Sequence, residues 1–182
     1  MHNRIFGSVA VTCFVAILAL GLASSGFSRS ARASADDLQV GQTVAIEGKS
    51  AGARTVQASE IEIQEVPSEE KLKGRIQDID TGANSLVVLG TRVFTAPDAQ
   101  IAARDGSLIP FSGLQKGWMV KVKGSLQGEG ALQASEVKVS REEAPDEAEV
   151  EGRVQRIDKA RSTMTVAGLT IRLTPATTIK FD

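Results

Sequence analysis

Apolar and polar residues alternate along most of the chain beyond residue 35, with a period of two. Val44 and Ile46 lie on one face of such a segment, and Val120 and Val122 lie on one face of another, where they alternate with lysines. This period is typical of half-buried antiparallel strands. Helical periodicity in this part is limited to one expected turn over residues 111–116. The pattern therefore predicts an all-β protein.

The alternation shifts by one residue at four places. After Ile76 the next apolar residue is Ile79, and the same kind of shift follows Ala58, Ala134 and Val154. A β-bulge moves the buried residues across a strand in this way and bends the strand, which favours closed sheets. The pattern predicts about five short strands per complete repeat, closing into a small barrel of the OB type or a related one.

Two pairs of segments repeat without gaps. Residues 72–101 align with residues 150–179, and nine of these 30 positions are identical. Residues 40–63 align with residues 116–139 and share the run Gln-Ala-Ser-Glu. Ordinary residue usage would give about two identities in the first of these alignments. The chain therefore contains internal repeats.

The order of the repeated segments is unusual. Only residues 71–140 contain a first half followed by a second half, whereas residues 36–64 are an orphan second half and residues 150–182 an orphan first half. Linkers over residues 65–70 and 141–149 join these parts, and each linker contains a proline and several acidic residues. These ranges are the predicted domain boundaries.

An orphan half of a sheet leaves apolar faces uncovered and strand edges unpaired. We therefore expect the two terminal halves to meet as a second barrel. The fold prediction is an all-β protein with two small five-stranded OB-like barrels, one contiguous and one assembled from the terminal halves. The alternative is completion between two molecules, as a swapped dimer or a head-to-tail chain.

The first 35 residues have the three zones of an export signal. Arg4 is followed by an apolar run from Ile5 to Ala23, and a stretch of small residues ends at Ala35. The pattern predicts an N-terminal signal helix with cleavage after Ala35, and so a periplasmic or secreted protein. The apolar run is also long enough to remain as a membrane anchor, which is the alternative.

The composition limits the catalytic groups, metal ligands and partners that the chain can have. The chain has 21 Lys and Arg, 22 Asp and Glu, and no Tyr, and its only His and Cys, His2 and Cys13, lie in the leader. A cleaved chain would thus lack imidazole and thiol groups and carry a net charge near −4, which disfavours nucleic acid as a partner. We expect no catalytic, metal-binding or cofactor-binding residues, and contact with a membrane only through the leader.

Five motifs point to a family. Gly-Arg-Ile-x-x-Ile-Asp covers residues 74–80, Leu-x-Val-x-Gly covers 86–90 and Pro-x-x-x-Ile covers 97–101, and longer patterns of Phe, Leu, Gly and Val cover 111–124 and 132–139. This pattern resembles the DUF5666 repeat of exported bacterial proteins. The resemblance implies a small β-barrel fold in a cell-envelope setting, and it assigns no functional residue.

Asp78 to Gly82 is similar to the start of a calcium-binding loop, which needs closely spaced oxygen ligands. The matching segment, residues 156–160, has Arg and Lys in place of ligands. We therefore interpret Asp80 and Asp158 as caps of hairpin turns.

Two other groups are candidates for binding. Arg75, Gln77, Arg153 and Gln155 recur in the repeats and form either a polar binding face or a solvated strand face. Trp118, the sole Trp, could stack on a sugar. Its counterpart in the repeat is Gln42, so packing in the core or at the barrel rim is the favoured interpretation.

Carboxylates are the remaining candidates for catalysis, and they lie in or beside the linkers, where we expect ordinary pKa values: Glu69-Glu70, Glu142-Glu143 and Asp146-Glu147. The prediction is a non-enzymatic exported module that acts by interaction or as a structural part of the cell envelope. Its expected partner is another envelope protein or a second copy of the chain. The alternatives are binding of a small ligand or oligosaccharide on a barrel face, and a carboxylate-dependent hydrolase.

Overall fold

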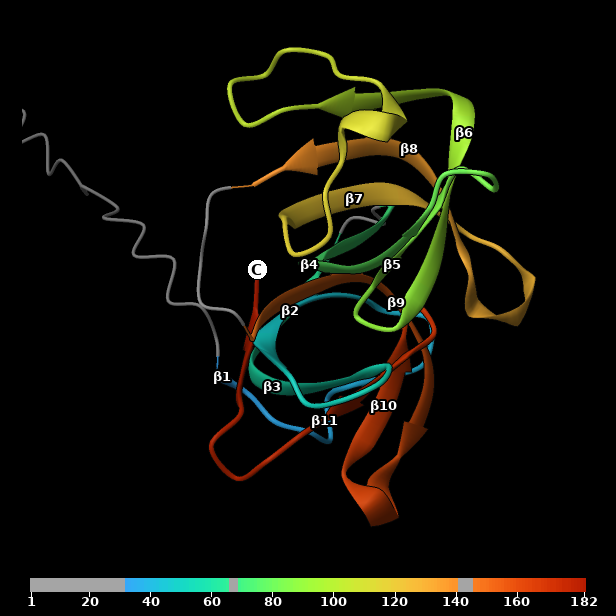
Figure 1. Ribbon diagram of the computed structural model, residues 1–182. Coiled ribbons are helices and arrows are strands. Elements are labelled where there is room, and N and C mark those ends of the chain that lie inside the picture. Colours follow the sequence, from blue (N-terminus) through green and yellow to red (C-terminus); the bar gives the residue numbers. More distant parts are fainter. Residues whose placement is uncertain (1–31, 66–68, 141–145) are drawn as a thin grey trace, which may run out of the picture.

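The computed structural model describes residues 32–65, 69–140 and 146–182, which form strands and short 3-10 turns (Figure 1). No α-helix occurs among these residues, and so none that could cross a membrane. The prediction of an all-β protein is confirmed. The predicted signal helix, within residues 1–31 of the leader, lies outside the described residues, as do residues 66–68 of the first predicted linker and residues 141–145 of the second.

The central part of the chain forms a closed barrel of five strands. These are β4 (Glu70–Asp80), β5 (Ser85–Val88), β6 (Thr91–Ala102), β7 (Met119–Leu126) and β8 (Leu132–Val139). Antiparallel pairing joins β4 to β5, β5 to β6, β8 to β7 and β7 back to β4, while β6 and β8 run parallel.

Seven further strands come from the two ends of the described chain: β1 (Arg32–Ala33), β2 (Thr43–Ser50), β3 (Thr55–Gln64), β9 (Glu147–Asp158), β10 (Thr163–Val166), β11 (Leu169–Arg172) and β12 (Thr178–Phe181). Strand β9 pairs with β10 and β10 with β11, while β11 and β12 run parallel to β3. Strand β2 pairs with both β3 and β9, and β1 pairs with β12. Segments that are distant in sequence therefore pair within one chain.

Each predicted shift of the alternation coincides with a shift of strand register. The extra residues are Gln77 in β4, Gln155 in β9, Ser59 in β3 and Ser135 in β8. The four predicted β-bulges are therefore confirmed. Because a bulge bends its strand, these positions help the sheets to curve.

The two sets of strands are joined edge to edge by β4 and β9. Lys71 pairs with Glu151, Leu72 with Val150 and Lys73 with Glu149 in an antiparallel ladder. Strand β9 begins at Glu147, so the last three residues of the predicted linker 141–149 belong to a strand. The acidic composition suggested a linker, but pairing with β2 on one side and β4 on the other extends the strand.

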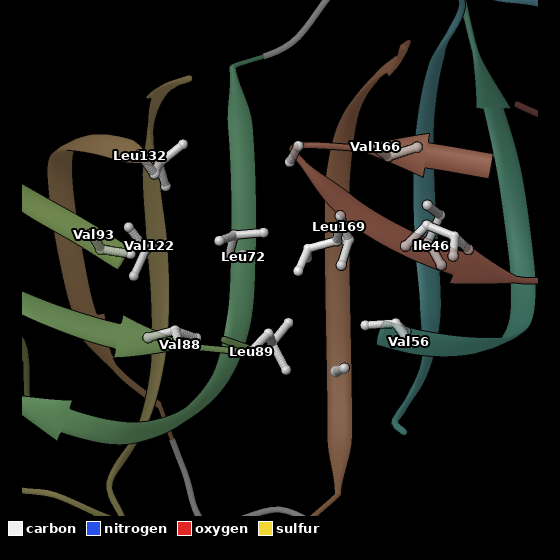
Figure 2. Close-up of a cluster of buried hydrophobic side chains, with 14 of the residues drawn as sticks. Ile46, Val56, Leu72, Val88, Leu89, Val93, Val122, Leu132, Val166 and Leu169 are labelled. Atoms are coloured by element: carbon white, nitrogen blue, oxygen red, sulfur yellow. The ribbon is translucent and has the colours of Figure 1, made fainter. Parts of the chain in front are cut away.

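Apolar side chains of both strand sets form one cluster (Figure 2). Leu72 of β4 and Leu169 of β11 are fully buried within it, as are Val88 of β5 and Val56 of β3. Leu89, in the turn after β5, is buried with a positive φ of 52°. The core therefore continues across the junction of β4 and β9.

Candidate functional site

The repeated glutamines lie at the bulges and stabilise the adjacent hairpins. Gln77 Oε1 accepts a hydrogen bond of 2.7 Å from the backbone N of Gly90, and Gln155 Oε1 accepts one of 3.0 Å from Gly168 N. Both glycines have positive φ, 76° and 72°. The two glutamine side chains are therefore used by the fold rather than presented as a pair of binding groups.

The serines of the repeated Gln-Ala-Ser-Glu run serve the same purpose in the other bulges. Ser59 Oγ donates to Glu47 O at 3.0 Å, and Ser135 Oγ donates to Lys123 O at 3.4 Å. Side chains at all four bulges thus bond to a neighbouring segment. Some of the identities that reveal the repeat in the sequence, those of the bulge glutamines and serines, therefore stabilise its bulges.

The two repeated arginines differ in their surroundings. Arg75 Nη1 donates to the carbonyl O of Gly117 at 2.7 Å, which ties β4 to the turn before β7. Arg153 is exposed on β9. The predicted polar face of Arg75, Gln77, Arg153 and Gln155 is therefore not one assembled site, because three of its members bond to nearby backbone.

The aspartates of the calcium-like motif cap turns, as the sequence predicts. Asp80 Oδ1 accepts from Ala83 N at 3.0 Å, and Asp158 Oδ1 accepts from Arg161 N at 3.1 Å. Hydrogen bonds from the backbone and side chain of Arg161 lower the pKa of Asp158. Within the described ranges, no group of three His, Cys, Asp or Glu residues is arranged to hold a metal ion.

Trp118 is half-buried at the entry to β7 and packs against the core. Its carbonyl O accepts a hydrogen bond of 2.8 Å from Ile76 N. The indole also lines a depression of about 520 Å³ together with Arg104, Asp105 and Met119. Rim packing, the favoured interpretation, is confirmed, and an aromatic surface beside an exposed arginine remains open to solvent.

Lysines and glutamates meet at the seam, which we define as the ladder between β4 and β9 with Lys121 of β7. The Lys73 Nζ lies 2.6 Å from Glu149 Oε1 and 3.4 Å from Glu147 Oε1. Lys121 Nζ lies 3.3 Å from the second oxygen of Glu149. Lys73 is only 7% exposed, so its charge is largely removed from water and depends on these carboxylates.

The second ion pair of the seam joins Lys71 to Glu151. The Lys71 Nζ lies 2.8 Å from both carboxylate oxygens. Positions 71 and 149 are equivalent in the repeat, as are positions 73 and 151. The two strands of the seam therefore carry opposite charges at equivalent positions, lysine on β4 and glutamate on β9.

Two acidic residues of the second linker region, Glu149 and Asp146, have a lowered pKa. Burial acts to raise the pKa of Glu149, but hydrogen bonds and charge from Lys73 and Lys121 outweigh it, and the pKa is lowered. A hydrogen bond from Lys49, at 3.0 Å, lowers the pKa of Asp146. The expectation of an ordinary pKa was wrong for Asp146, because its backbone O also bonds to Ser50 N and brings it beside β2.

Arg54 is a residue of the junction that sequence reasoning missed. Its Nη2 donates to the carbonyl O of Gly130 and to that of Gly168, both at 3.0 Å. Its own carbonyl O accepts from Thr170 N at 2.8 Å. Arg54 is equivalent to Gly130 in the repeat and shares its positive φ, at 53° against 72°. The presence of arginine where the repeat has glycine was the sequence signal that could have identified this residue.

A cavity of about 450 Å³ lies at the end of the terminal strand set and was also missed. Its apolar lining includes Leu38, Met164 and Ile179, and Ala33 and Ala35 lie at its edge. No pattern in the sequence indicated this cavity, because residues 33–35 match the end of an export signal. The cavity instead places them beside the folded core.

Three segments of the chain, residues 27–62, 73–138 and 151–182, match the model of one protein family, the Domain of unknown function (DUF5666). The chain belongs to the DUF5666 family. No curated protein and no solved structure matches it. The three segments of this DUF5666 protein follow the order of the repeats: an incomplete one, a complete one and a second incomplete one. The first match begins at residue 27, upstream of β1.

Proposed function

We propose that this DUF5666 protein is an exported, non-enzymatic module that acts by interaction or as a structural part of the cell envelope. Its working body is two OB-like repeat barrels, the central one and one formed by the joined terminal halves, with residues 65–69 and 140–146 between the strands of the two parts. The observation that carries the proposal is the identical order of strand pairing in the two parts.

In the central barrel the pairing order is β4, β5, β6, β8, β7 and back to β4. In the terminal set the order is β9, β10, β11, β3, β2 and back to β9. The parallel pair falls at the same step in both, β6 with β8 and β11 with β3. This order is similar to that of a five-stranded Greek-key barrel of the OB type.

Opposite charges at the seam favour pairing of β4 with β9 over pairing of either strand with the same strand of a second copy. If β4 paired with β4 of a second copy in the same register, Lys71 would face Lys73 of that copy. Pairing of β9 with β9 of a second copy would likewise place Glu149 directly opposite Glu151 of that copy. Like charges placed directly opposite destabilise a strand pair. The charges therefore select β9 as the partner of β4.

The carboxylates support a non-enzymatic role. A general acid at neutral pH needs a raised pKa. The pKa of Glu149 is lowered by its lysine neighbours, and that of Asp146 by Lys49. These two groups therefore stay ionised and bound to lysine, which argues against the alternative of a carboxylate-dependent hydrolase.

For the leader we favour retention as an anchor over cleavage after Ala35. Arg32 pairs with Lys180 and Ala33 with Ile179, so a cut after Ala35 would remove β1 and expose the edge of β12. Retention keeps the module in the cell envelope and tethered to the membrane. Intact mass measured on the protein from the envelope fraction distinguishes the two: 19.2 kDa supports the anchor, and the mass of residues 36–182 contradicts it.

The test of the whole proposal is photo-crosslinking in the producing cell, with the crosslinker at exposed Arg153 and, as a control, at Gln155, whose side chain is engaged by the fold. We expect a specific envelope protein to be captured from position 153 and not from 155, with the chain in the envelope fraction. A chain found in the cytoplasm, or equal capture from both positions, would contradict the proposal.

The depression beside Trp118 favours a second candidate function, the binding of an oligosaccharide. Sugars stack on exposed aromatic faces, and Arg104 supplies hydrogen-bond donors at the same depression. Because Trp118 is the sole Trp, its fluorescence reports on this surface alone. A saturable change with glycans that is lost in Arg104→Ala would support this candidate, and an unchanged signal would contradict it.

A further inference from the structure

The two strand sets end differently at one repeated position. Ala33 pairs with Ile179, and the equivalent central contact is the hydrogen bond of 2.9 Å from Ile109 N to Ile101 O. Ile101 and Ile179 are equivalent positions in the first half of the repeat, which recurs after 78 residues. Ala33 and Ile109 are separated by 76 residues, the offset at which the second half of the repeat recurs. The same piece of backbone therefore crosses the same end of both units.

Side chains fill this end only in the central barrel. Ile109 and Phe111, the first residue of the 3-10 turn Phe111–Gly113, are half-buried and pack against the core. Their counterparts in the terminal set are Ala33 and Ala35. A phenyl ring and a branched aliphatic chain are replaced by two methyl groups, and both alanines line the cavity of about 450 Å³.

The walls of the cavity are apolar and its mouth is polar. Leu38 and Met164 are buried at the wall, at 4% and 2% exposure, and Ile179 is buried at 6%. At the mouth the Lys159 Nζ forms an exposed ion pair of 2.9 Å with Asp36. Small-molecule sites in proteins combine an apolar body of about 300–1,000 Å³ with a few polar groups, as here.

We propose that this cavity binds a small apolar ligand that carries one aromatic ring or a ring-sized aliphatic group, with any polar substituent at the mouth beside Lys159. The central barrel indicates the chemistry of the occupant, because the equivalent space there takes a phenyl ring and a branched aliphatic chain from the protein itself. This site is separate from the seam and from Trp118, so it goes beyond the proposed function. It rests on one part of that proposal, the retention of residues 33–35, which the intact mass tests separately.

Methionine methyl groups allow a direct test. The chain has only three methionines: Met164 in the wall of the cavity, Met119 at the Trp118 depression, and Met1. Full-length chain with ¹³C-methyl methionine is held in lipid nanodiscs, so that Ala33 and Ala35 stay attached, and is titrated with indole. We expect a saturable shift of the Met164 signal. A shift of Met119 without Met164, or no saturable shift, would overturn the proposal.

Two filling variants provide the specificity control. Ala35→Phe and Ala33→Ile restore the residues of the central barrel, and we expect each to weaken the indole-induced shift of Met164 by tenfold or more. The Met164 resonance without indole reports whether each variant is folded, and the two substitutions act at different positions. Binding of indole that is unchanged in both folded variants would overturn the proposal, because the ligand would then occupy another place.

Discussion

The central barrel and the terminal strand set have the same pairing order but differ in how their ends are closed. Gly130 stands where the terminal set has Arg54, and Phe111 stands where it has Ala35. In Figure 1 the central strands β5 to β8 lie above β2, β3, β10 and β11. Backbone pairing therefore maintains the fold that the two parts share. A few side chains decide that the central barrel fills its own end and that the terminal set contacts the central barrel through Arg54.

Connectivity also differs between the two regions. The longest connection inside the central barrel is residues 103–118, between β6 and β7, whereas β2 and β9 of the terminal set are separated by the whole central barrel. The entropic cost of closing a loop grows only with the logarithm of its length, so this separation costs little stability. It does make the contacts of the terminal set longer in range, which slows folding.

The largest effect is expected from substitutions at the bulges, where they test whether the backbone approaches a glycine equally closely in both regions. A Cβ added at Gly48 would meet the backbone O of Gln57, and one added at the equivalent Gly124 would meet that of Gln133. We expect Gly48→Ala and Gly124→Ala each to lower the free energy of unfolding by about 4 kcal/mol, because backbone must move. Urea unfolding measures this.

Gly128→Ala is the matched control, because its Cβ would meet nothing within 4 Å. We expect it to change the free energy of unfolding by less than about 0.5 kcal/mol. A variant at Gly48 that behaves like the control, while Gly124→Ala is strongly destabilising, would break the equivalence of the two regions.

The next effect concerns the seam between the regions. The double variant Lys71→Glu with Lys73→Glu places like charges opposite each other, and we expect a loss of about 3 kcal/mol in urea unfolding. Adding Glu149→Lys and Glu151→Lys reverses both strands and should recover most of that loss. If the fourfold variant is no more stable than the double one, charge complementarity does not join the two regions.

A smaller effect sharpens the difference between the two barrel ends. Phe111→Ala empties the space that the central barrel fills, and we expect a loss of about 2 kcal/mol, since the ring is half-buried. Ala35→Phe adds the same ring to the terminal set, and we expect no loss. Thermal unfolding of both variants measures this, and equal losses would mean that the terminal end has no room for a ring.

The smallest effect is a pH dependence at the seam. The pKa of Glu149 is lowered in the folded chain from its ordinary value of 4.5, so its contribution is complete above that value and is lost as the pH falls through the lowered pKa. Below about pH 4.5 we expect the free energy of unfolding to fall less steeply with decreasing pH in Glu149→Gln than in wild type. The difference between the two falls is about 1 kcal/mol. Exposed Asp98, changed to Asn, serves as the control. An acid profile of Glu149→Gln that matches wild type would contradict the role of this ion pair.

Much of the fold follows from local patterns. The period of two predicts the strands, and the shifts after Ile76 and Ala58 predict bulges that the structure contains. Gly124 lies inside β7, at the register shift. Glycine there is required by the close approach of Gln133, a contact across strands that no local pattern encodes.

The amino-acid sequence by itself determined the strand class, the bulges and the turn caps, because each depends on residues that are near one another along the chain. Tertiary structure alone decided the roles of Arg54, Lys73 and Ala35. Their neighbours come from segments tens of residues away, and whether a side chain is paired, buried or beside an empty space depends on which of those segments it meets.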